Sequence, residues 1–384
     1  MTYRLYGGPG SLYTAKARSY LIKQGIAFEN WAARAPRFQT EIVPKIGRWI
    51  IPVLEAMDGQ IIQDGSDIIA HFEVRGATPL PAFPDTPRHS LIAQIFELFG
   101  GEGLLRPAMH YRWNFDETNG AFLLRDFTAA LAAYGATEAE KTETFARSSG
   151  RMRKAMAGFG VSPETIPAVE ASYAEFLRLF DEHLAGSPYL LGGRPTIGDY
   201  GLIGPLYAHL ARDPYPSELM KRTAYRVWRW TERMNAPNQD AGEYGNPPED
   251  LFAHDAVPQT LTRLLRFVAE DYLPEVEAFV GFSNDWLAER PDMPAGVNGM
   301  PRSQDRVIGQ VTFEWRGLPL RVNVLPYRFY LLQKVQALYD GAESPGRAEM
   351  DALLEETRLL PLVQLRTPRR IERSGHLEVW SAPD

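Results

Sequence analysis

The first 80 residues of the chain alternate between strand and helix signals, and this order constrains the fold more than any other feature. A short strand candidate, Tyr3–Tyr6, ends at a glycine-rich breaker, after which Ser11 can cap a helix over residues 13–24. Gly25 then ends this helix, and residues 26–31 form a second strand candidate. The chain is therefore predicted to begin with a strand–helix–strand unit.

A hairpin and a helix complete this unit. Residues 50–56 and 58–62 are strand candidates joined by an Asp-Gly turn, which is a strong hairpin signal. A polar Asp-Gly-Ser-Asp segment then leads into a helix over residues 68–74. The order βαβ–ββα predicts a compact α/β domain over residues 1–78, and the prolines that follow predict a linker over residues 79–87.

The rest of the chain is predicted to be an all-helical domain over residues 88–245, followed by an extension over residues 246–384. Inside the helical domain, Thr196 and Asp199 have the spacing of a capping box at the start of a helix. We expect an α+β extension that packs on the helical domain. Its expected elements are a helical stretch over 261–287, strands over 306–315 and 318–324, a helix over 327–339, and small strands at 369–371 and 377–380.

The composition of the chain argues against several classes of function. The chain has no cysteine, which excludes disulfides, thiolate metal sites and a cysteine nucleophile. The histidines lack metal-binding spacing, so no metal is expected. A net charge of −7 disfavours a nucleic-acid partner. With no signal-peptide pattern at the start and no long apolar run, we expect a cytoplasmic protein without a membrane partner.

Three local patterns resemble those of one family. Gly10–Arg18 resembles the Ser/Cys-Pro-Tyr-Ser start of the first helix in cytosolic glutathione transferases. Ile51–Leu54, together with Asp64–Ile69, resembles the Val-Pro-x-Leu and Glu/Gln-Ser-x-x-Ile pair of that family. Leu191–Tyr200 resembles the signature of its helical domain. The resemblance covers about residues 1–240 and implies a thioredoxin-like domain followed by a glutathione-transferase-type helical domain.

The resemblance also implies a glutathione site in the first domain, with glutathione as co-substrate. A cis Ile51–Pro52 bond would let the backbone of Ile51 pair with the cysteinyl backbone of glutathione. The helix start beyond Asp64 would hold the γ-glutamyl group. Gly65 stands where the family has serine, which removes a hydroxyl. The expected glutathione-binding residues are Lys45, Arg48, Ile51, Pro52, Asp64, Gly65 and Ser66.

Ser11 is the first candidate for catalysis. It matches the Ser/Cys position of the family, where a hydroxyl and the helix dipole would favour the thiolate of glutathione over the thiol. A plain N-cap is the structural alternative. Tyr6 and Tyr13 are further candidates as hydrogen-bond donors to the thiolate, although each also fits a packed aromatic side chain.

The segment Met109–Phe115 combines aromatic and polar residues in the region where the family places its electrophile pocket. We predict that His110, Tyr111 and Trp113 line this pocket. A tightly packed helix junction is the alternative interpretation.

The main functional hypothesis is a transferase that conjugates glutathione to a small apolar electrophile. Without a cysteine, the thiol–disulfide branch of the family is excluded. A non-catalytic binding or interaction protein and a glutathione-dependent lyase or isomerase remain as alternatives. The resemblance further implies a homodimer.

Overall fold

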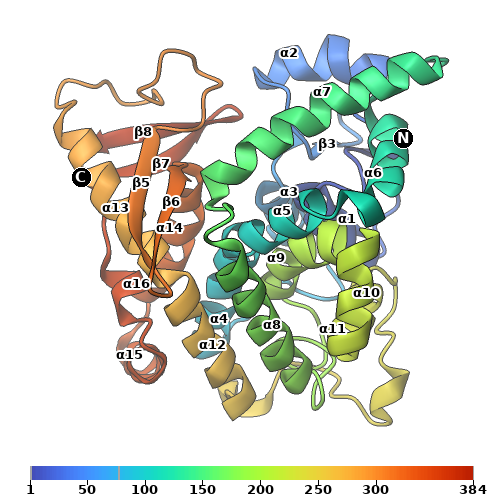
Figure 1. Cartoon of the computed structure of the whole chain (residues 1–384). Coiled ribbons are helices and arrows are strands. Elements are labelled where there is room, and N and C mark those ends of the chain that lie inside the picture. Colours follow the sequence, from blue (N-terminus) through green and yellow to red (C-terminus); the bar gives the residue numbers. More distant parts are fainter. Residues whose placement is uncertain (1, 77, 384) are drawn as a thin grey trace.

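The N-terminal domain is a small mixed sheet flanked by helices (Figure 1). The computed structural model describes residues 2–76 and 78–383, so residues 1, 77 and 384 of the predicted domain ranges lie outside the described residues. The strands are arranged in the order β2–β1–β3–β4, with β1 parallel to β2 and antiparallel to β3. Their bounds are β1 (Tyr3–Tyr6), β2 (Phe28–Trp31), β3 (Val53–Glu55) and β4 (Ile61–Gln63).

Three of these strands begin later than the sequence predicts. The strand predicted from residue 58 starts at Ile61, because the residues before it form the turn of the hairpin. The strand predicted from residue 26 starts at Phe28, because the backbone N–H of Ile26 still bonds to the end of the preceding helix. The strand predicted from residue 50 starts at Val53, directly after Pro52, which has no N–H to offer to a ladder. The predicted cis bond between Ile51 and Pro52 is confirmed.

The helices of this domain begin at polar caps. Ser11 caps α1 (Leu12–Lys23), and its side chain accepts a hydrogen bond from Thr14 N, as predicted. The second long helix, α3 (Gly65–Glu73), starts three residues earlier than predicted because Asp64 caps it through Ser66 N. A shorter helix, α2 (Val43–Ile46), precedes β3 and follows a π-helical segment at Phe38–Ile42.

The helical domain follows the proline-rich segment. The predicted capping box of Thr196 and Asp199 is confirmed, with Asp199 buried and Thr196 N donating to its carboxylate at 2.9 Å. The helices are α4 (Pro87–Leu98), α5 (Leu105–Trp113), α6 (Asp116–Leu131), α7 (Glu138–Met156), α8 (Ile166–His183), α9 (Ile197–Pro205), α10 (Pro214–Thr223) and α11 (Tyr225–Arg233). Short π- or 3-10-helical segments lie at Phe99–Gly103, Ala157–Phe159, Leu206–Ala211, Gly242–Tyr244 and Ala253–Asp255.

The extension contains both helices and hairpins, as predicted. The stretch over 261–287 is helical, as expected, but it is divided into two helices at Tyr272, directly before the second helix with Pro274 in its first turn. The elements are α12 (Gln259–Asp271), α13 (Leu273–Ala288), β5 (Gly309–Trp315), β6 (Leu318–Val324), α14 (Tyr327–Asp340), α15 (Ser344–Thr357), α16 (Leu360–Gln364), β7 (Arg369–Ser374) and β8 (Leu377–Pro383).

The extension packs on both preceding domains and not on the helical domain alone (Figure 1). Helix α14 lies against α4, and Arg328 Nε of α14 donates to Glu102 Oε2, in the π-helical segment that follows α4, at 3.0 Å. From the same helix, Tyr330 Oη donates to Asp67 Oδ1 of α3 at 2.6 Å. The N-terminal domain is thus covered by the end of its own chain. Across residues 2–76 and 78–383, no helix has the length and apolar character to cross a membrane.

Candidate functional site

An apolar cavity of about 300 Å³ lies between the N-terminal domain and the helical domain. The N-terminal side is formed by Gly8–Tyr13, Ala33 and Trp49–Ile51. The helical side comes from α5, α6 and α7 and includes Met109, Trp113, Phe127, Leu131 and Met152. A mainly apolar wall with a few polar groups is typical of a small-molecule site.

Ser11 lies at the cavity wall and at the N-terminus of α1. Its Oγ accepts a hydrogen bond from Thr14 N at 3.4 Å, and among the described residues its hydroxyl proton has no acceptor. The free N–H groups at the start of a helix favour a negative charge nearby. The Ser11 hydroxyl can therefore donate a hydrogen bond to an anionic group inside the cavity.

Arg112 fixes the loop that carries Ser11. Its Nη1 donates to Gly10 O at 2.8 Å, and its Nε donates to Asp213 Oδ2 at 2.7 Å. Both Arg112 and Asp213 are buried, so each charge is neutralised by the other. Gly10 is needed here because a Cβ would lie 2.4 Å from Asp126 Oδ2.

The two tyrosine candidates differ in position. Tyr6 is buried against Phe38, and its Oη donates to Glu55 Oε2 at 2.9 Å, outside the cavity wall. Burial, together with the hydrogen bond to Glu55, raises the pKa of Tyr6 to about 12. Tyr13 does line the cavity, but its Oη donates to Glu102 Oε1 at 3.2 Å. Both phenols are thus already bonded to carboxylates.

The three residues predicted to line the substrate pocket lie on different sides of α5. Trp113 lines the cavity, whereas His110 and Tyr111 face other helices. His110 is buried with Nε2 2.9 Å from Glu170 Oε1, and burial lowers its pKa. The Tyr111 ring stacks on Phe115 with centroids 5.6 Å apart. Of the three residues, Trp113 therefore lies at the cavity, whereas His110 and Tyr111 have packing partners within the helical domain.

The Asp64-Gly65-Ser66 segment is engaged in internal contacts. Asp64 has a positive φ of 91° and caps α3. Gly65 packs closely against α1, and a Cβ would lie 3.1 Å from Tyr13 O, so the serine that the family has here would require a small shift of its neighbours. The Ser66 hydroxyl lies 2.7 Å from Lys16 Nζ and is buried.

The two basic candidates for glutathione binding, Lys45 and Arg48, lie in different environments. Lys45 lies on the exposed surface of α2. Arg48 is buried, and its guanidinium bonds to Gln63 Oε1 at 3.0 Å and to Glu378 of β8. A second residue of the extension, Arg373, forms ion pairs near the start of α3. Neither contact could be foreseen from the sequence, because no local pattern connects β7 and β8 with residues more than 300 positions earlier.

Comparison with known families gives two matches. A family described as glutathione S-transferase, N-terminal domain, matches residues 5–79, and a family described as glutathione S-transferase, C-terminal domain, matches residues 163–233. The chain belongs to the glutathione transferase superfamily. The predicted fold class is therefore confirmed, and the extension over residues 246–384 lies beyond both matched domains. No curated protein matches the sequence.

Solved structures of this superfamily's fold are similar to the chain. A glutathione transferase from Phanerochaete chrysosporium is 15% identical, with 62% of this chain and 98% of that chain covered and a TM-score of 0.43. A beta-etherase from Sphingobium sp. strain SYK-6 is 16% identical, with 64% and 99% covered and a TM-score of 0.41. Glutaredoxin 2 from Salmonella typhimurium, solved with glutathione, is 16% identical, with 63% and 98% covered and a TM-score of 0.39.

The cavity therefore lies between the two domains of a glutathione transferase fold. Its remaining titratable side chains include Asp126, which is paired with Arg212 at 2.7 Å, and His209, whose pKa is lowered well below its usual value by burial. In residues 2–76 and 78–383, no cluster of histidine, aspartate and glutamate has the composition of a metal site. Ser11, Ser148 and Arg151 are further polar residues of the cavity wall, and of these Ser11 lies at the N-terminus of α1.

Proposed function

We propose that this protein is a glutathione-dependent enzyme that joins the thiol of glutathione to a small apolar electrophile. One observation carries the proposal. Ser11, at the N-terminus of α1, and Ile51, directly before Pro52, line the same cavity of about 300 Å³ as the apolar side chains of α5–α7. A thiolate held beside Ser11 would therefore face an electrophile held by the helical domain, away from bulk water.

The proposed chemistry follows from the absence of cysteine in the chain and from the hydroxyl of Ser11. Because the sequence has no cysteine, the sulfur nucleophile must come from the co-substrate. Glutathione would lie along the backbone of Ile51 as an added strand, with its sulfur towards Ser11. The thiol of glutathione would lose its proton to water, and the Ser11 hydroxyl would donate a hydrogen bond to the resulting thiolate. The thiolate then attacks the electrophilic carbon, forms the S–C bond and displaces the leaving group, which departs with the electron pair of the broken bond. A hydrogen bond to a charged group contributes about 1.5–3 kcal/mol.

Replacing Ser11 tests this role. We expect Ser11→Ala to lower kcat/KM for conjugation of glutathione to apolar electrophiles by roughly 10- to 100-fold, since a charge-assisted hydrogen bond is lost. The measurement is a conjugation assay with a panel of electrophiles, combined with a thermal melt of each protein. Conjugation that proceeds at an unchanged rate in Ser11→Ala would remove Ser11 from the mechanism.

Thr137→Ala is the matched control. Thr137 is the exposed N-cap of α7 and lies outside the cavity wall, so its loss removes a capping hydroxyl without touching the site. Both substitutions should cost about 1 kcal/mol of stability. Only Ser11→Ala should affect catalysis, which separates a chemical role from simple capping.

A second function is favoured by a different observation. The family resemblance implies that Arg48 holds the glycyl carboxylate of glutathione and Asp64 its ammonium. Both residues are paired with residues of the extension. A protein that binds an apolar molecule without glutathione would have the same arrangement. Calorimetry with glutathione at millimolar concentration distinguishes the two, because the second function predicts no heat of binding for any variant.

A further inference from the structure

The β7–β8 hairpin brings two charged side chains onto residues that the proposed function assigns to glutathione. The guanidinium of Arg48 bonds to both carboxylate oxygens of Glu378, at 2.5 and 2.8 Å. Arg373 Nε lies 3.0 Å from Asp67 Oδ2, and its Nη2 lies 3.5 Å from Asp64 Oδ2. The two hairpin residues also pair with each other, with Arg373 Nη1 2.6 Å from Glu378 Oε1.

The charges of these contacts match two charged groups of glutathione, the ammonium of its γ-glutamyl end, which lies beside a carboxylate, and the carboxylate of its glycyl end. Arg373 presents a cation to the carboxylate of Asp64, and Glu378 presents a carboxylate to Arg48. We propose that the β7–β8 hairpin is an internal occupant of both charged glutathione subsites, and that glutathione binds by displacing Arg373 and Glu378 together. This inference rests on the proposed function, since it concerns the same site.

With Arg373 and Glu378 in these positions, the charges of the contacting side chains have counter-ions. Arg48 and Glu378 are both less than a tenth exposed, so each needs the other as a counter-ion. Arg373 also lies over the ring of Tyr330, 4.6 Å from its centroid, while Tyr330 Oη donates to Asp67. Glutathione must therefore replace ion pairs that already exist, and the net gain from its charged ends is small.

The hairpin is held by apolar packing at its base and by ion pairs near its tip. Its base is fixed by Ile371 and Trp380, which are opposite each other and buried, and Trp380 N donates to Val297 O at 2.9 Å. Arg373 and Glu378 are also directly opposite each other, two positions further towards the exposed tip at Gly375. Movement of the tip about the base would therefore release both side chains at once.

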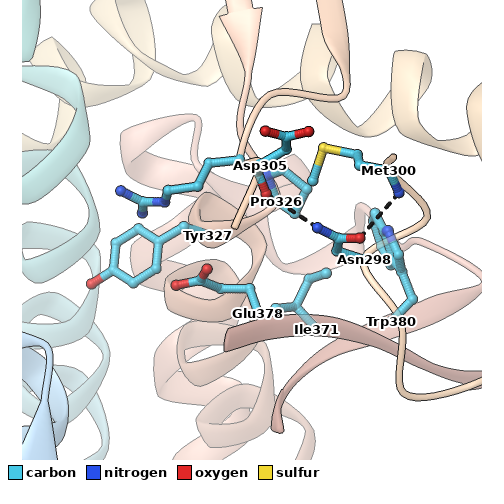
Figure 2. Close-up of a pocket in the computed structure, with 9 residues that line it drawn as sticks. Asn298, Met300, Asp305, Pro326, Tyr327, Ile371, Glu378 and Trp380 are labelled. Atoms are coloured by element: carbon cyan, nitrogen blue, oxygen red, sulfur yellow. Dashed lines mark hydrogen bonds between the residues drawn. The ribbon is translucent and has the colours of Figure 1, made fainter. Parts of the chain in front are cut away.

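A smaller pocket on the extension side of the hairpin does not offer another place for glutathione. It is lined by Tyr327, Glu378 and Trp380, which Figure 2 shows around a narrow space next to Asn298. Its volume of about 10 Å³ is close to that of one water molecule. Glutathione in this region must take the positions that Arg373 and Glu378 now hold.

Calorimetric titration of the full chain with glutathione tests the inference. The double variant Arg373→Met, Glu378→Gln cannot form ion pairs with either subsite. We expect it to bind glutathione at least tenfold more tightly than the unmodified chain. The control is Arg370→Met, Glu372→Gln, with the same charge changes on exposed positions of β7. It should bind as the unmodified chain does. Equal affinity of the double variant and the control would overturn the inference.

Hydrogen exchange on the unmodified chain gives a test that needs no variant. With glutathione at saturation, the backbone amides of residues 373–379 should exchange faster, because the tip leaves its partners. Unchanged or slower exchange in this segment under saturation would contradict displacement.

The two proposals can fail separately. Tighter glutathione binding by the double variant, combined with full conjugation by Ser11→Ala, would support the hairpin inference and remove the proposed role of Ser11. Conjugation by the unmodified chain, with no gain in affinity for the double variant, would do the reverse. Absence of glutathione binding in every variant would overturn both.

Discussion

The ammonium of Lys16 lies in the interior of the molecule, next to the segment that holds Asp64. Its Nζ lies 2.5 Å from Glu97 Oε1, and the Ser66 hydroxyl donates to the same oxygen at 2.6 Å. Burial raises the pKa of Glu97, but the ammonium groups of Lys16 and Lys334 outweigh it and lower the pKa to about 2. This carboxylate thus holds α1, α3 and α4 together.

The Glu97 contact predicts how stability depends on pH. The folded pKa of about 2 lies below the ordinary value of 4.5, so the stabilisation is present above about pH 4.5 and is lost as the pH falls towards 2. Glu97→Gln should therefore lower the free energy of unfolding by roughly 2–3 kcal/mol at pH 7. Urea titrations of both proteins across this range measure the difference, which should shrink towards pH 2. A constant difference would contradict the assigned pairing.

Helices α4 and α9 approach each other closely because glycines lie at their contact. A Cβ on Gly201 of α9 would lie 2.6 Å from Glu97 Cα, and one on Gly100 would lie 2.4 Å from Leu202 N. Because α9 also packs on α1, this contact determines where the N-terminal domain meets the helical domain. The cavity depends on that arrangement.

Alanine substitution tests this contact. Gly201→Ala should destabilise the fold by about 2–3 kcal/mol, since backbone atoms must move apart. In contrast, Gly150→Ala, inside α7, has no atom within 4 Å of the new Cβ and should stabilise by about 0.5–1 kcal/mol. Chemical denaturation of both variants gives the two values. A neutral Gly201→Ala would mean that α4 and α9 pack less closely than described.

Elements with local signals could be predicted from the sequence. Ser11 and Thr196 cap their helices as expected because an N-cap needs only a hydroxyl and the next turn of backbone. The contacts of Arg48 could not be predicted, because its partner Glu378 lies 330 residues away and both sit in segments without a motif. For the same reason, the side of α5 that faces the cavity was not evident from its residues, and His110 lies outside the cavity wall.

At the scale of the whole molecule, one apolar core joins the three parts of the chain. It runs from Leu5 of β1, through Phe99 and Phe176, to Val335 and Trp380 of the extension. The rings of Trp286 and Trp380 stack with centroids 6.1 Å apart, which ties the base of the β7–β8 hairpin to α13. The extension is therefore part of the fold and not a separate domain.

This shared core predicts that the extension does not unfold on its own. Scanning calorimetry of the full chain should give one transition, with a calorimetric enthalpy equal to the van't Hoff enthalpy. Two separated transitions, the first confined to residues after 246, would show that the extension is an independent unit.

The central claim is that Ser11 stabilises the thiolate of glutathione in the cavity. The most direct measurement is the ultraviolet absorbance of the thiolate of bound glutathione as a function of pH, at saturating glutathione, for the unmodified chain and for Ser11→Ala. The account predicts that the thiol titrates at a pH at least one unit lower in the unmodified chain than in the variant. The same titration curve for both proteins, or no thiolate signal from either, would contradict it.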